Sequence, residues 1–245
     1  REKAGIMRAG RPAVCSDPAA PASLAECALQ VGAELALLGA GFNYADKGET
    51  WTWWSGDSVL EGLPRPALSG SYQLRNASGV LKAVDLLQGK HPVPAAVIAE
   101  ALAQTTLPGR FQRIPGEVEI VLDVAHNAQA VDTFVATLRA LPRVPRTHVV
   151  LGMLKTKDRL SAMSALADIA DEWHLATVQA AKGASADELH ATWRQLPRKA
   201  PASCHASVAE AFAAARAPAR PGERVVAVGS FITVGEVLRI VAPTP

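Results

Sequence analysis

The spacing of apolar residues divides the chain into two parts with different patterns. Before residue 106, helical periodicity is confined to residues 22–31, 71–88 and 94–104, and short apolar runs broken by Gly, Asp and Asn lie among them. After residue 117, apolar runs alternate regularly with amphipathic stretches. We therefore expect a first unit of helices and short strands, and a second unit built of repeated β-α segments.

The first unit is predicted to contain an isolated strand at 11–15 and an antiparallel sheet. The short runs that suggest this sheet are separated by turn residues and lie at 34–38, 42–45, 50–54 and 58–60. Aromatic side chains are concentrated here, namely Phe42, Tyr44, Trp51 and Trp53. Such a group can form a ligand cage, but packing of the core is the better interpretation because large aromatic side chains usually supply buried surface.

The second unit is predicted to be an open, mostly parallel, doubly wound α/β sheet of the Rossmann-like kind. Its expected strands are 118–122, 148–151, 172–176, 202–205 and 224–228. Its expected helices are 128–140, 158–170, 185–195, 207–216 and 231–241. Strands buried on both faces by crossover helices read as continuous apolar runs. Ligands of such sheets bind at the carboxyl ends of the strands.

Composition excludes several classes of protein. The formal net charge is only +2, without a dense cluster of Lys and Arg, so nucleic-acid binding is not expected. No apolar run approaches the length of about 20 residues that crosses a bilayer. The cysteines Cys15, Cys27 and Cys204 lack the spacing of a metal site or a disulfide framework, which favours reduced thiols and a cytoplasmic location.

Polar residues follow the first predicted strand of the second unit directly. Asp123, His126 and Asn127 stand where this strand gives way to a helix. One interpretation is a helix N-cap, with Asp123 or Asn127 accepting backbone N–H bonds. The other is a ligand site, in which Asp123 binds ribose hydroxyls or a cation and His126 contacts phosphate. Both interpretations remain open, although the absence of G-x-G-x-x-G argues against a nicotinamide dinucleotide.

Other candidate residues carry weaker signals by themselves. Arg110 follows a Pro-Gly turn at the boundary between the two patterns, where a guanidinium can clamp a phosphate or act as a salt-bridge staple. Asn76 reads as a capping or solvated residue, and Lys3 reads as a surface lysine. The pair Gly229-Ser230 opens the last helix and suits either an anion or a tight turn.

Several short motifs occur together and in order along the chain. They are EKAGI at 2–6, Q-x-x-NA at 73–77, LPGRFQ at 107–112, DVAHN at 123–127, GMLKTKD at 152–158 and GSF at 229–231. In this arrangement the chain resembles the bacterial folylpolyglutamate synthase/dihydrofolate synthase family, which is related to the Mur ligases. The resemblance implies the C-terminal part of a P-loop ATP-binding domain at 1–106, a hinge at 107–112 and a Rossmann-like domain at 113–245.

The resemblance also implies a reaction. Members of the family use ATP and Mg²⁺ to activate a carboxylate as an acyl phosphate, which the amine of L-glutamate attacks; the acceptors are dihydropteroate and folyl(poly)glutamates. By position in the motifs, Asn76, Arg110 and Asp123 match nucleotide-binding residues. His126 looks like a further, catalytic contact. Lys3 matches a carbamylated lysine whose carboxylate binds Mg²⁺, a cation that prefers oxygen.

The sequence departs from the family pattern in one major respect. No G-x-x-x-x-G-K-[ST] P-loop occurs in the 245 residues, and the chain opens at Arg1 inside a motif. We therefore expect a C-terminal fragment, inactive alone, of a monomeric cytoplasmic ligase that acts on small molecules, without nucleic-acid or membrane partners. A Mur-type peptide ligase and a non-catalytic nucleotide-binding module are the alternatives.

Overall fold

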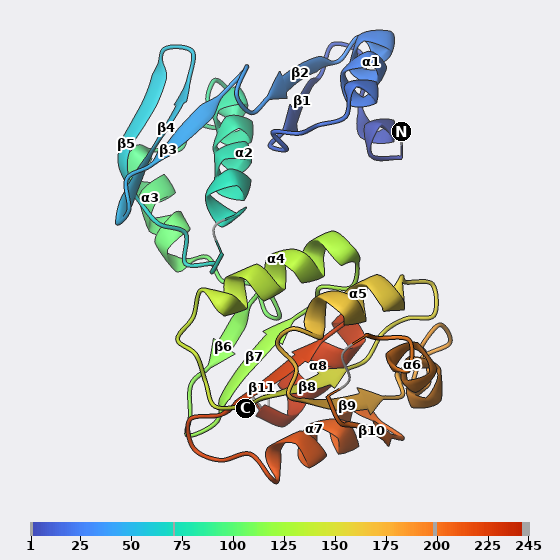
Figure 1. The fold of residues 1–245 in the computed structure, drawn as a ribbon. Helices are drawn as coiled ribbons and strands as arrows, with labels where there is room; N and C mark the ends of the chain where they lie inside the picture. Colours follow the sequence, from blue (N-terminus) through green and yellow to red (C-terminus); the bar gives the residue numbers. More distant parts are fainter. Residues whose placement is uncertain (1, 71, 198–199, 242–245) are drawn as a thin grey trace. The chain divides into compact units, whose positions relative to one another are not determined.

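The computed structural model describes residues 2–70, 72–197 and 200–241. By the contacts among its residues the chain divides into two compact units, Arg1–Thr106 and Leu107–Pro245 (Figure 1). Residues 107–112, which the sequence suggests as a hinge, belong to the second unit in this division. Each unit has its own buried core.

The first unit begins with a small parallel pair of strands. A 3₁₀ turn η1 (Lys3–Ile6) precedes β1 (Pro12–Cys15), helix α1 (Ala22–Val31) and β2 (Glu34–Leu37). The expectation that β2 joins an antiparallel sheet is wrong, because β2 pairs in parallel with β1. Helix α1 serves as the crossover between these strands, and Gly32 ends it in the left-handed conformation.

The remainder of the first unit is an antiparallel sheet with two helices. Strands β3 (Asn43–Asp46), β4 (Thr50–Ser55) and β5 (Ser58–Pro64) form the sheet, and α2 (Tyr72–Leu87) and α3 (Ala95–Gln104) follow. Trp51 and Trp53 are fully buried and, with Phe42, pack against apolar residues of α2 and α3. The prediction that these aromatic residues form core is confirmed.

A six-stranded sheet organises the second unit. It consists of β6 (Gln112–Ile114), β7 (Glu119–Asp123), β8 (Thr147–Leu151), β9 (Glu172–Ala176), β10 (Ala202–His205) and β11 (Arg224–Val228). The order across the sheet is β10-β9-β8-β11-β7-β6, and every neighbouring pair is parallel except β6 with β7. The mostly parallel, doubly wound sheet is confirmed. Edge strand β6 was not expected.

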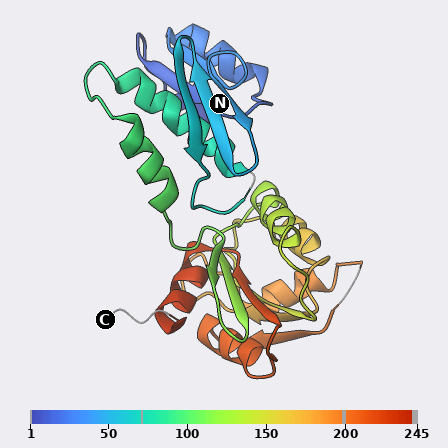
Figure 2. The same cartoon turned by 90° about the vertical axis from the view of Figure 1, so that its left-hand side faces the viewer.

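Helices cover both faces of this sheet, as Figure 2 shows. Their bounds are α4 (Ala128–Arg139), α5 (Arg159–Leu166), α6 (Ala186–Trp193), α7 (Val208–Arg216) and α8 (Phe231–Val241). The first three cover one apolar core and the last two the other. Side chains of Asn127, Asp158, Ser185 and Ser207 cap the N-termini of the first four helices.

Among the described residues, no helix combines the length and apolar character needed to cross a membrane. The cysteines Cys15, Cys27 and Cys204 are all free thiols.

Candidate functional site

Asp123 is the last residue of β7 and lies buried at the carboxyl edge of the sheet. Its two carboxylate oxygens accept different backbone N–H groups, Oδ2 from Phe111 at 2.7 Å and Oδ1 from Ala125 at 2.7 Å. The side chain therefore ties the segment before β6 to the loop after β7. Asp123 is not the helix cap, because the Asn127 side chain accepts the N–H of Ala130 and caps α4.

The turn that Asp123 holds is strained. Phe111 has a φ of 44°, which places a bulky residue in the left-handed region. Such a conformation costs about 1 kcal/mol or more for a residue other than glycine. The N–H bond to Asp123 and the packing of the buried Phe111 ring against Phe134, at 5.6 Å between centroids, keep the turn in place. Arg110, directly before Phe111, is thereby presented on the surface.

Arg110 and His126 both lie beside the ring of Phe231, the first residue of α8. The Arg110 guanidinium carbon is 5.4 Å from the ring centroid, a cation–π distance. The His126 and Phe231 rings are 6.4 Å apart. Because the Val124 carbonyl can only accept, the His126 Nδ1–H donates to it at 2.8 Å and Nε2 is left for another partner. The structure thus brings Arg110, Asp123 and His126 together.

Burial and the neighbouring donors have opposite effects on the charge of Asp123. Burial raises the pKa of the Asp123 carboxyl, while the N–H groups of Phe111 and Ala125 and the positive charge of Arg110 act in the opposite direction. A carboxylate oxygen has two acceptor positions, so each Asp123 oxygen retains capacity for one more donor. A ligand at this edge would meet the exposed guanidinium of Arg110, the ring of Phe231 and the remaining acceptor positions of Asp123.

The neighbouring strand β11 ends in a tight turn rather than an open anion site. Ser230 is buried, and its hydroxyl accepts the N–H of Thr233 at 3.1 Å. Gly229 has a φ of 116°, and a Cβ there would lie 2.6 Å from the carbonyl oxygen of Gly152. The Gly229-Ser230 pair is therefore explained by space and helix capping.

Asn76 lies on α2 in the first unit. Its side-chain amide donates to Gln73 Oε1 at 3.1 Å, and both residues line a pocket of about 250 Å³ between α2 and α3. The other lining residues are mainly apolar, among them Val80, Val97 and Ala101. An apolar slot with a few amide groups is suited to a flat, partly polar ligand.

Lys3 lies in η1 and is strongly exposed. Its Nζ is 3.2 Å from a carboxylate oxygen of Glu2, and the side chain is 92% accessible. If the amine carried a carbamate, Lys3 and Glu2 would offer two oxygen groups, the number that Mg²⁺ commonly takes from a protein before phosphates and water complete its shell. The residues present are compatible with Mg²⁺ but do not enclose it.

Sequence reasoning missed two residues of the edge. Phe231 supplies the ring that Arg110 covers. Its signal in the sequence was its place in the GSF motif at 229–231, and the structure shows it 61% exposed. Phe111 carries the left-handed turn, for which its sequence gives no sign. The charged GMLKTKD segment has structural partners, since Lys155 pairs with Glu188 at 3.7 Å and Asp158 caps α5.

Comparisons with known proteins identify the family to which the chain belongs. Residues 109–231 match the family model "Mur ligase, glutamate ligase domain". A curated dihydrofolate synthase/folylpolyglutamate synthase of Escherichia coli K12 is 33% identical over 98% of this chain and 54% of its own length. The solved structure of E. coli FolC in complex with DHPP and ADP is similar at 33% identity with a TM-score of 0.86, over 98% of this chain and 55% of that one.

A second solved structure extends the comparison. A bifunctional folylpolyglutamate synthase/dihydrofolate synthase with Mn, AMPPNP and L-glutamate bound is 31% identical, with a TM-score of 0.84 over 98% of this chain and 55% of that chain. The chain spans about half the length of the curated relatives it matches. By the match over its second unit and the likeness over nearly its whole length, the chain belongs to the Mur ligase family.

Proposed function

We propose that the protein containing this chain is an ATP-dependent ligase that adds L-glutamate to dihydropteroate and to folyl(poly)glutamates through an acyl phosphate. The observation that carries the proposal is the alignment of 98% of this chain with a relative named for both activities. Relatives solved with ADP, with AMPPNP and with L-glutamate support ATP and glutamate as substrates. The 245 residues alone are expected to be inactive, because no P-loop motif occurs among them.

The edge residues would act on the nucleotide. Arg110 is the exposed cation at the site and would contact phosphate oxygens, where its planar fork favours bidentate bonds. Asp123 would accept a ribose hydroxyl with its remaining lone pairs while holding the 107–112 segment. His126, whose Nε2 is uncommitted among the described residues, would donate to a phosphate when protonated.

The first unit would supply the remaining contacts. We propose that it is the later part of the ATP-binding domain, that residues 107–112 are its hinge to the C-terminal domain, and that Asn76 contacts the nucleotide. A carbamate on Lys3 would hold Mg²⁺, which offsets charge on transferring phosphoryl groups. The cytoplasmic location and the monomeric state remain predictions from the sequence.

The test is a substrate comparison with the full-length protein that carries this chain. Incorporation of radiolabelled L-glutamate and release of ADP are measured with dihydropteroate, with a tetrahydrofolate and with UDP-muramoyl peptide acceptors. Glutamate-dependent ADP release with the pterin acceptors supports the proposal. Turnover of only the muramoyl acceptors would identify a peptide ligase, and ADP binding without turnover of any acceptor would identify a nucleotide-binding module.

A further inference from the structure

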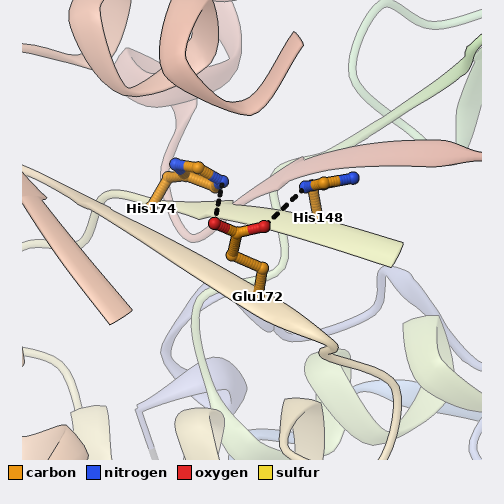
Figure 3. Close-up of side chains that lie close together, drawn as sticks. All are labelled: His148, Glu172 and His174. Carbon is orange, nitrogen blue, oxygen red and sulfur yellow. Dashed lines mark ion pairs between the residues drawn. The ribbon is translucent and has the colours of Figure 1, made fainter. Parts of the chain in front are cut away.

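Buried ionisable side chains also gather near the amino ends of β8, β9 and β10, away from the edge that carries Asp123. His148 and Glu172 are direct neighbours across β8 and β9, and His174 lies two residues further along β9. One ligand atom from each of the three lies within 4.8 Å of the others, the only such group found among the described residues. Figure 3 shows the Glu172 carboxylate between the two rings. His148 and His174 are 0% and 3% exposed.

The hydrogen bonds of His148 define which nitrogen carries its proton. Its Nε2 lies 3.0 Å from a carboxylate oxygen of Glu223. A carboxylate accepts only, so Nε2 is the N–H donor, and in the neutral form of the ring the lone pair lies on Nδ1. This Nδ1 is buried, lacks a hydrogen-bond partner, and faces Glu172 Oε2 at 3.3 Å. Two acceptors facing each other at this distance are unfavourable unless a proton on the ring or a metal cation lies between them.

His174 repeats this arrangement from the other side of the carboxylate. Its Nε2 is buried without a hydrogen-bond partner, 3.9 Å from Glu172 Oε1. Its Nδ1 lies 3.4 Å from the hydroxyl of Ser203. Two unpartnered nitrogens therefore converge on one carboxylate.

We propose that His148, Glu172 and His174 bind a divalent cation of the Zn²⁺ class, a site separate from the nucleotide edge. Two imidazoles and a carboxylate are ligands typical of Zn²⁺, with bonds of about 2.0–2.2 Å. Tetrahedral ligands at that distance lie about 3.4 Å apart. His148 Nδ1 lies 3.3 Å from Glu172 Oε2, and His174 Nε2 lies 3.9 Å from Glu172 Oε1, so a bound ion would draw His174 closer. One ion satisfies both orphaned nitrogens, and a water completes the shell.

The surroundings suit a cation. Glu223 holds the ring of His148, an arrangement that orients a metal-ligating histidine and raises its basicity. Arg146 pairs with Glu172 Oε2 at 3.0 Å and leaves Oε1 directed at His174. Two carboxylates and one guanidinium give the group a net negative charge. The Glu172 side chain is 24% accessible, which provides a path for entry to the otherwise buried site.

The experiment uses the full-length protein freed of metal by a chelator and then titrated with Zn²⁺ or Co²⁺. We expect saturable binding of one ion, visible-region Co²⁺ bands typical of a tetrahedral site, and perturbed ¹⁵N resonances of His148 and His174. Zn²⁺ at about a hundred times its Kd should raise Tm by roughly 5 °C. The unaltered protein suffices for these measurements, so the test does not depend on a variant that folds.

Variants then locate the ion. His148→Gln and His174→Gln should each abolish saturable binding, and Glu223→Gln should weaken it about 10- to 100-fold. His91→Gln, an exposed histidine of the first unit, is the matched control and should bind normally. Absence of saturable binding, retention of binding in both ligand variants, or a thiolate charge-transfer band from Cys204 would each overturn the proposal. So would ¹⁵N shifts of a His148 imidazolium that Zn²⁺ leaves unchanged.

Discussion

The two ends of the six-stranded sheet bury ionisable groups in opposite ways. At the carboxyl edge, each oxygen of Asp123 accepts one backbone N–H group, so neither oxygen is buried without a partner. Near the amino ends of β8 and β9, His148 Nδ1 and His174 Nε2 are buried without hydrogen-bond partners. A buried polar atom without a partner costs free energy. Asp123 therefore holds the fold whether or not a ligand is bound, whereas the two orphaned nitrogens indicate a missing partner.

Substitution of Asp123 should have the largest effect on stability. Asp123→Ala leaves the N–H groups of Phe111 and Ala125 unpaired, and each such buried group costs about 1–3 kcal/mol, so we expect a loss of about 4 kcal/mol in the free energy of unfolding. Urea denaturation of the second unit measures it. Asp132→Ala, an exposed change on α4, should stay within about 0.5 kcal/mol. A small loss in Asp123→Ala would show that the turn holds without its carboxylate.

The pH dependence of stability should differ in sign between the two ends. The pKa of His174 is depressed from 6.5 to about 4, so the unfolded chain binds a proton first and stability is lost as pH falls through this range, by up to about 3 kcal/mol. The pKa of Asp123 is raised, so its contribution is lost as pH rises above the ordinary value of 3.8.

The predicted loss of stability at low pH is tested by comparing the wild type with His174→Gln in the presence of a chelator. Urea denaturation from pH 4 to 7.5 gives the free energy of unfolding of each protein. The difference between the two free energies of unfolding isolates His174, because Asp123 and the other groups titrate in both proteins. A difference that does not change with pH would mean that His174 is not held neutral by burial.

Arg110 should separate activity from stability. Arg110→Ala in the full-length ligase should lower kcat/KM about 100-fold, the order of effect seen when one donor to a transition-state charge is removed. Its unfolding free energy should change by less than about 0.5 kcal/mol, because the side chain is exposed. Arg113→Ala, whose partner Glu119 lies on β7, is the control and should remain active. Unchanged activity in Arg110→Ala would assign Arg110 a purely structural role.

The smallest effect concerns the helix cap beside Asp123. Asn127→Ala removes the acceptor for the N–H of Ala130 and should cost about 1 kcal/mol. Asn127→Ser retains an acceptor and should restore most of this loss in thermal unfolding. A loss in Asn127→Ala as large as that in Asp123→Ala would remove the distinction between an ordinary cap and the clamp on the 107–112 turn.

Much of the sheet could be predicted because buried parallel strands have continuous apolar runs bounded by turn residues. The runs at 172–176, 202–205 and 224–228 match β9, β10 and β11 residue for residue. Strand β6 reads Gln-Arg-Ile and carries no such run, so it was missed. The predicted pairing of β2 was wrong for a different reason, because an apolar run indicates that a strand forms but not which strand it pairs with.

The carboxyl edge was easier to predict than the histidine cluster. Asp123 and His126 are close in sequence and follow a predicted strand directly. In a parallel sheet, the carboxyl ends of the strands are where ligands bind. The family motifs place Arg110 and Asp123 at one site, and the two residues do lie close together in the structure. The left-handed turn at Phe111 is visible only in the structure. His148 and Glu172 are far apart in sequence and meet because of the register of β8 with β9.

The close approach of Gly152 and Gly229 has a consequence for how this edge can change. Both glycines stand in motifs by which the family was recognised, yet each fills a space that a side chain would need: the Gly152 oxygen blocks a Cβ at 229, and Thr233 and Val178 block one at 152. Glycine is therefore required at these two positions by the lack of space, and its presence there says nothing about the chemistry of the site. A designer who wishes to alter this edge cannot use the two glycines, whereas Phe231, two residues after Gly229, is 61% exposed and has room to vary.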